Sequence, residues 1–248
     1  MRSFNLCLFF IFFVNTYSQK NVTIEYQNFY DTNTPLKRTS ILYINGSENF
    51  SLFQDMLSTS KPWLKDIDEN KEETTIASMR RNMDIFILTD NLLNRTIYED
   101  FSQKYFAITD TLKLQWEISD ENKFIDKYKC YKATTVFRGI IWEAWFTYEI
   151  PFSFGPWKLN GLPGVILQAN DVNKVYTFNV KNIKIDNLIS VNVPEKNFEI
   201  LNIQDYVKLK DEFYLNLFES VARDDRDVVI ERKTNLRNTI EPKYEWEE

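Results

Sequence analysis

Two glutamates and a tryptophan, all within nine residues of each other, are the first candidates for binding a ligand. Over residues 142–150, apolar side chains alternate with Glu143, Trp145 and Glu149. This two-residue period is typical of a half-buried β-strand, so the three side chains are expected to share its polar face. A tryptophan between carboxylates could stack on a ligand or bind a cation. Alternatively, a neighbouring segment covers Trp145, and the glutamates are solvated charges on the sheet.

Catalysis has little support in the same residues. Glu143 and Glu149 would lie about 20 Å apart along a strand, whereas the paired carboxylates of glycosidases are separated by roughly 5 to 9.5 Å. The sequence contains no histidine, which excludes Ser-His-Asp and Cys-His nucleophiles and histidine-containing zinc sites. Glycine-rich nucleotide-binding motifs are also missing from the sequence. We therefore expect no catalytic residue, metal or cofactor, with a carboxylate-dependent hydrolase as the alternative.

Cys130 and Lys132 lie in another alternating segment and would face the same way on a regular strand. A lysine beside a thiol lowers the pKa of the thiol and makes the cysteine reactive. The alternative is a buried cysteine that packs as a small apolar side chain. Cys7 falls within the expected signal peptide described below, so the mature chain would have one cysteine and no intramolecular disulfide.

Glycine and proline are concentrated after this strand, in the segment 151–164. Asn160-Gly161 predicts a tight turn, and Pro163-Gly164 predicts a type II turn in which Gly164 has a positive φ. A rigid loop loses little entropy on binding, and aromatic side chains supply a large contact area. We therefore expect the segment 142–170, with its rigid turns, to present Trp145 or Trp157 to a binding groove. The alternative is that Trp157 plugs the core and the turns exist to position it.

Short alternating segments follow one another along most of the chain and predict a mainly β fold. We expect a curled antiparallel sheet, or half-barrel, because long open sheets twist. One amphipathic helix is expected at 204–223, capped by Asn202, with an apolar stripe that packs on the sheet and closes it. The stripe consists of Tyr206, Leu209, Phe213, Leu217 and Val221.

Three connecting segments complete the expected architecture. A single helical turn is predicted within 47–58, a polar loop at 60–82 and a turn at 120–122. The loop contains an acidic run that could bind a cation, but it lacks the glycine and the ligand spacing of a calcium loop. A solvated or disordered loop is the interpretation that its composition favours.

The first eighteen residues have the features of a secretory signal peptide. Arg2 precedes an apolar run at 4–14, and Thr16 and Ser18 provide small residues for a cleavage site. No later segment is long and apolar enough to cross a membrane, so the mature chain, 19–248, is expected to be one domain without a transmembrane segment. The formal net charge of −6 gives no electrostatic attraction to nucleic acid.

A short motif and a longer segment around it resemble a known family. Gly161, Leu162, Pro163 and Gly164, followed by Val165 and Ile166, resemble the signature hexapeptide of the GLPGLI family, with valine in place of a leucine. The upstream segment 128–134 is similar to the cysteine-containing strand of that family and includes Cys130 and Lys132. The resemblance covers about 128–171, roughly a sixth of the chain.

This resemblance implies an exported protein of a Gram-negative bacterium with no established activity. Its location would be the periplasm or the periphery of the outer membrane, and its partner an unknown ligand or an envelope or outer-membrane protein. We therefore expect a non-enzymatic binding or interaction protein. The alternatives are the carboxylate-dependent hydrolase and a structural envelope protein without a small ligand.

Export makes the first testable prediction. The signal peptidase should cut after Ser18, because small residues precede that bond, and the mature protein should begin at Gln19. N-terminal sequencing or the intact mass of the protein from the cell envelope checks this. A retained Met1, or a lipid on Cys7, would contradict it.

Overall fold

A computed structural model describes residues 20–32, 35–57, 85–90, 95–99, 105–110, 113–186, 199–224 and 240–247. Two predicted features lie outside these residues: the signal peptide 1–18 and the polar loop 60–82. The side chains of Leu217 and Val221 also lie outside the described part of the chain.

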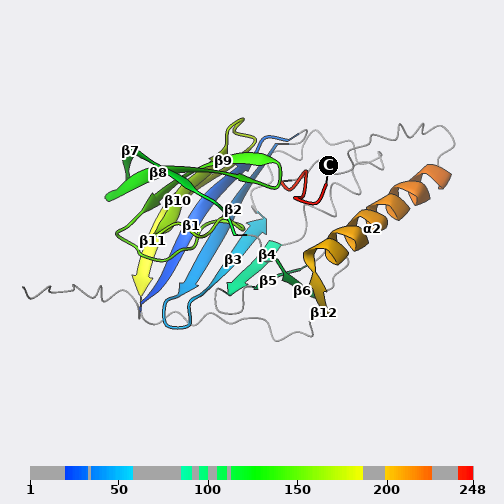
Figure 1. Cartoon of the computed structure of the whole chain (residues 1–248), viewed down its shortest axis with the longest axis horizontal. Helices are drawn as coiled ribbons and strands as arrows, with labels where there is room; N and C mark the ends of the chain where they lie inside the picture. The colour runs from blue at the N-terminus through cyan, green and yellow to red at the C-terminus, as the bar shows by residue number, and fades with distance from the viewer. Residues whose placement is uncertain are drawn as a thin grey trace, which may run out of the picture.

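Twelve strands in the described residues form one twisted sheet, which confirms the mainly β fold (Figure 1). Their spatial order is β12-β6-β5-β4-β3-β2-β1-β11-β10-β9-β8-β7, so β12 and β7 are the edges. Neighbours are antiparallel except for the parallel pair β12–β6. The elements are β1 (Asn21–Tyr30), β2 (Leu36–Asn45), β3 (Phe50–Leu57), β4 (Ile85–Asp90), β5 (Arg95–Glu99), β6 (Tyr105–Thr109), β7 (Glu117–Ile125), β8 (Tyr128–Phe137), β9 (Ile140–Thr147), β10 (Val165–Asp171), β11 (Tyr176–Asp186), β12 (Glu199–Asn202) and the helix α2 (Ile203–Asp224).

Alternation along β1, β2 and most of β9 separates a buried inner face from an outer face. In β1, Val22, Ile24 and Tyr26 are buried and the residues between them are half-buried. Leu42 of β2 and Ala144 of β9 belong to the same inner face, because the cross-strand register keeps side chains of equal parity together. The core therefore lies on one side of the sheet.

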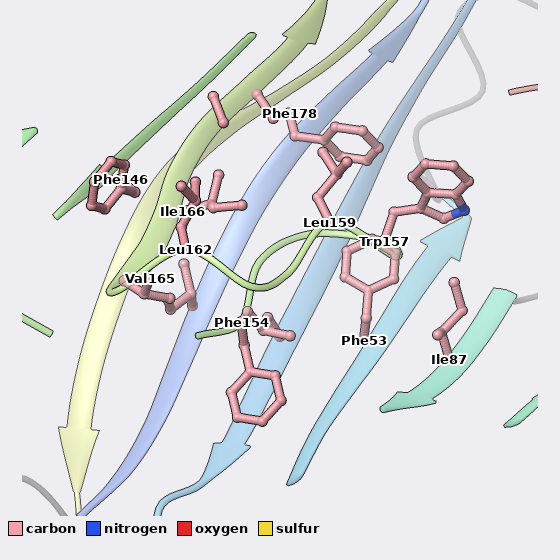
Figure 2. Packing of buried hydrophobic residues seen from close by; sticks show 14 of the residues in the cluster. Phe53, Ile87, Phe146, Phe154, Trp157, Leu159, Leu162, Val165, Ile166 and Phe178 are labelled. Carbon is pink, nitrogen blue, oxygen red and sulfur yellow. The ribbon is translucent and has the colours of Figure 1, made fainter. Parts of the chain in front are cut away.

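A segment of the chain itself fills this inner face. Residues 150–164 connect β9 to β10, and we call them the core segment. This segment crosses the inner face of the sheet, and most of its apolar side chains are buried (Figure 2). These side chains are Ile150, Phe152, Phe154, Trp157, Leu159 and Leu162. Its backbone polar groups are satisfied locally: Gly161 N donates to Ser153 O at 3.0 Å, and Ile166 N donates to Phe154 O at 3.1 Å.

Trp157 lies in the core rather than at a groove. Its side chain is 8% exposed, and its ring centroid lies 5.6 Å from that of Trp142 and 5.5 Å from that of Phe137. Trp157 also has a φ of 56°, which is rare for a bulky residue and which the surrounding packing must stabilise. The structure therefore agrees with the alternative interpretation, in which Trp157 plugs the core and the tight turns position it.

Gly164 does not have the positive φ that the Pro163-Gly164 pattern predicts. Among the glycines of the described residues, Gly139 and Gly161 have it, with φ values of 79° and 92°. A glycine is instead required at position 164 because the backbone of Thr147 approaches it closely. A Cβ atom there would lie 2.0 Å from the carbonyl oxygen of Thr147. The sequence identified the position but not the reason, because only the folded chain brings the end of β9 against it.

The helix is where the sequence predicts it, but it does not close the sheet. Asn202 caps α2 by accepting a hydrogen bond from the backbone N of Asp205 at 2.8 Å. Tyr206 is buried and packs on Phe106 of β6 with ring centroids 5.6 Å apart, whereas Leu209 is 44% exposed and Phe213 is 40% exposed. The helix starts at the sheet edge and extends away from it (Figure 1), because the core segment already occupies the inner face.

Two local predictions are wrong for a shared reason. The helical turn expected within 47–58 is the strand β3, and the turn expected at 120–122 is a bulge inside β7, where the register shifts between Ile118 and Asn122. In both segments polar residues suggested a break in the sheet. Pairing with a neighbouring strand overrides such weak local preferences.

Gly164 and Gly161 provide a matched test of the core segment. Gly164→Ala should lower the free energy of unfolding by at least about 3 kcal/mol, because the new methyl group meets a backbone atom that cannot rotate away. Gly161→Ala should lower it by about 1–2 kcal/mol, the cost of a left-handed backbone with open space around it. Chemical denaturation measures both, and equal losses would refute the close approach.

Candidate functional site

Glu143 and Trp145, two of the four predicted binding residues, lie together on the outer face of β7 to β10. Trp145 of β9 lies directly between Lys132 of β8 and Gln168 of β10 in the cross-strand register. Glu143 precedes Trp145 on the same face and is also half-buried. We call Lys123, Lys132, Glu143, Trp145 and Gln168 the Trp145 cluster.

A lysine from the edge strand covers Trp145. The Nζ atom of Lys123 lies 4.0 Å from the centroid of the Trp145 ring and donates a hydrogen bond to Gln168 Oε1 at 2.6 Å. Partial burial lowers the pKa of Lys123, although the nearby Cys130 and Glu143 act in the opposite direction. A cation does contact this tryptophan, but it comes from a neighbouring strand of the same chain.

Lys132 occupies the space between two carboxylates. Its Nζ lies 3.3 Å from Glu143 Oε1 and 3.5 Å from Glu121 Oε1, and the hydrogen bond to Glu143 raises the pKa of Lys132. The Glu121 side chain is 62% exposed, so these ion pairs contribute at most about 1 kcal/mol to stability.

Glu149 does not share the strand face of the other candidates. Strand β9 ends at Thr147, whose hydroxyl accepts a hydrogen bond from the Glu149 backbone N at 3.2 Å. The Glu149 carboxylate then accepts a hydrogen bond from the backbone N of Lys129 at 2.8 Å. The expected regular strand through Glu149 is wrong, because the chain turns there into the core segment.

Cys130 is a buried apolar residue. Its side chain is fully buried, and burial raises the pKa of the thiol to about 11, although Lys123 lowers it. Lys123 is also its direct cross-strand partner. Desolvation outweighs the effect of the ammonium group, so the second of the two sequence interpretations agrees with the structure.

The four glycine, leucine and proline residues at 161–164 form the exit of the core segment. Leu162 is 1% exposed and belongs to the core cluster, whereas Pro163 and Gly161 are exposed. Trp116 Nε1 donates a hydrogen bond to Asn160 O at 2.8 Å and fixes the turn just before them. Their position gives these four residues a role in the fold, which is to lead the chain out of the core segment into β10. Any binding role for them stays a prediction.

Three residues with important contacts, Lys123, Gln168 and Arg138, were not predicted from the sequence. The interpretation of 120–122 as a turn removed Lys123 from the sheet, and Gln168 is its hydrogen-bond partner only through a contact between residues 45 apart in sequence. Arg138 is fully buried, pairs with Asp110, Glu241 and Glu245, and lies 4.5 Å from the centroid of the Tyr244 ring. It fixes residues 240–247 to the turn between β8 and β9, and no local pattern indicated this.

Glu241 is the second anchor of this C-terminal segment. Both of its carboxylate oxygens accept hydrogen bonds from Lys158 Nζ at 2.8 Å. Burial alone would raise the pKa of Glu241, but the neighbouring cations, with Lys158 first among them, outweigh burial and lower it. The contact joins the C-terminal segment to the core segment.

Within the described ranges, no group of three or more histidine, cysteine, aspartate or glutamate side chains could hold a metal ion. The same residues include no helix with the length and apolar character needed to cross a membrane.

Cys130 gives a direct test of burial in this region. Iodoacetamide should label the folded mature protein at neutral pH far more slowly than the unfolded protein, because the buried thiol stays protonated. Mass spectrometry measures both rates, and Cys130→Ser is the control for labelling elsewhere. Equal rates would contradict the burial of Cys130.

Comparisons with known proteins identify a fold and a short motif. Residues 137–168 match a family described as "Protein of unknown function (Porph_ging)". No curated protein matches the sequence. The fold is similar to a structure titled "Structure of PNGF-II in C2 space group", with 16% identity, a TM-score of 0.52, and coverage of 76% of this chain and 32% of that one.

Two further solved structures show lower similarity. An uncharacterized conserved protein from Thermus thermophilus has 8% identity and a TM-score of 0.41, with coverage of 76% of this chain and 94% of that one. A putative outer membrane lipoprotein-sorting protein domain from Vibrio parahaemolyticus has 9% identity and a TM-score of 0.25, with coverage of 70% and 88%. This chain spans about a third of the length of PNGF-II, and that likeness concerns the fold alone.

Proposed function

We propose that this protein is an exported, non-catalytic envelope protein that binds another macromolecule through the Trp145 cluster. The observation that carries the proposal is the filling of the inner face by the core segment. A small ligand on that face would have to displace Trp157 and Leu159, which are 8% and 0% exposed. Binding to the outer face requires no such rearrangement.

The Trp145 cluster has the composition of a protein contact. An indole ring supplies a large rigid surface, and Lys132 and Glu143 supply charges that give a partner its orientation. Lys123 and Gln168 hold one side of the ring in place, which lowers the entropy lost on binding. The site is therefore organised before a partner arrives.

Family and location belong to the same proposal. The motif at 161–166 and the match at 137–168 support membership of the GLPGLI family of exported proteins. The apolar segment at 4–14 supports export, which would place the mature chain in the periplasm or at the outer-membrane periphery. An envelope or outer-membrane protein is the partner that this location favours.

A structural envelope protein without a ligand is the second candidate function, because a filled inner face also fits that role. The two differ at Trp145. In the binding protein, this side chain contributes to a partner contact and little to the fold, whereas in a purely structural protein its removal changes no interaction.

A pull-down from native envelopes distinguishes the two functions. Trp145→Ala should reduce the recovery of a specific partner by at least about tenfold, the effect of losing an aromatic hot spot, with little change in melting temperature. Trp145→Phe should restore part of the binding. Ile185→Ala is the control, because Ile185 is 37% exposed but lies on β11, outside the Trp145 cluster.

Recovery of the same partners by the wild type and Trp145→Ala would refute the binding site. A large fall in melting temperature with Trp145→Ala would show that the residue serves the fold.

A further inference from the structure

The turn between β7 and β8 is basic and aromatic in an otherwise acidic protein. Residues 123–129, here called the hairpin tip, read Lys-Phe-Ile-Asp-Lys-Tyr-Lys, and the whole chain has a formal net charge of −6. Strand β7 ends at Ile125 and β8 begins at Tyr128, so the tip lies at an end of the sheet edge (Figure 1). Asp126 forms the turn with a φ of 53°.

All three lysines of the hairpin tip lie against aromatic rings. The Nζ of Lys123 is 4.0 Å from the Trp145 centroid, that of Lys127 is 5.4 Å from Tyr128, and that of Lys129 is 5.2 Å from Tyr131. None of the three ammonium groups has a carboxylate of the described residues within 4.0 Å, whereas Lys132 has two. Among the described residues, the tip therefore carries cations that no carboxylate neutralises by direct contact.

Large apolar side chains are exposed beside these cations. Phe124 is 70% exposed and lies across from Lys129 in the register. Tyr148, at the end of β9, is 48% exposed and packs edge-on against Tyr131 with ring centroids 5.3 Å apart. The nearest acidic groups are Asp126 at the turn and Glu149, whose carboxylate accepts a hydrogen bond from the backbone of Lys129. Glu143 also acts on Lys123, and β7 carries Glu117, Asp120 and Glu121, of which Glu121 pairs with Lys132.

From this arrangement we infer that the hairpin tip docks on an anionic lipid surface. Phe124 enters the boundary between headgroups and acyl chains, Tyr148 lies at headgroup level, and Lys127 and Lys129 contact the phosphates. Exposed aromatic rings beside lysines are the composition that proteins place at membrane interfaces. Lysines near such a surface are attracted by its negative potential.

The size of the tip distinguishes a lipid surface from a protein partner. A specific protein contact buries about 800 Å² on each side, which a seven-residue turn does not provide. Docking on a lipid surface needs no matching shape, because mobile headgroups and acyl chains adapt to the side chains. The inference rests on the hairpin tip and does not require the partner proposed for Trp145.

Co-sedimentation with lipid vesicles tests the inference. The mature protein should bind vesicles of equal parts phosphatidylglycerol and phosphatidylcholine, and bind phosphatidylcholine alone at least about tenfold less. Phe124→Ser and the double variant Lys127→Gln/Lys129→Gln should each reduce binding by about tenfold. Raising the salt concentration should weaken the binding of the wild type.

Val136→Ser is the matched control, because Val136 is also 70% exposed but lies at the opposite end of β8. It should bind vesicles like the wild type, and thermal melts should show that all variants are folded. Absence of binding to anionic vesicles overturns the inference. The inference is also overturned if the lysine variant loses binding and Phe124→Ser does not. That result would indicate non-specific electrostatic attraction to the vesicle without insertion of Phe124. Phe124 is not part of the Trp145 cluster, so Phe124→Ser should leave recovery of the pull-down partner unchanged, and this test and the pull-down can fail separately.

Discussion

The close approach of Gly164 to Thr147 is the constraint on which the rest of the structure depends. It allows the chain to leave β9, cross the inner face and return beside the same strand as β10, with Val165 N bonded to Ile150 O at 2.9 Å. A side chain at position 164 would keep the two backbones apart. Without this return, the apolar side chains of the core segment would have no position on the sheet.

Filling the inner face from within has consequences for every other element. Helix α2 finds no apolar surface there and meets the sheet at its edge through its first turns, including Tyr206. Residues available to a partner are then those of the outer face and the edges. The Trp145 cluster is half-buried and held by its own polar contacts, so it is rigid without being closed.

Strand β8 is fixed at one end and exposed at the other. At its C-terminal end Arg138 is buried among three carboxylates and two aromatic rings of the C-terminal segment and its surroundings. A buried guanidinium is stable only when such partners replace water, so this end cannot open without leaving a charge unpaired. At its N-terminal end the hairpin tip carries lysines without such partners. The same strand thus joins a structural anchor to a surface suited for docking.

Local sequence determined the elements, and tertiary structure determined what covers them. Strict alternation was enough to predict β1 and the outward direction of Trp145, and Asn202 with Asp205 was enough to place the start of α2. Burial of Trp157, the lysine over Trp145 and the position of α2 were not predictable in this way. The periodicity of apolar residues predicts which face of an element is apolar. It does not predict which segment packs on that face, because that segment is distant in sequence. The bulge in β7 shows the limit most clearly, because three polar residues read as a turn until pairing with β8 keeps them in the sheet.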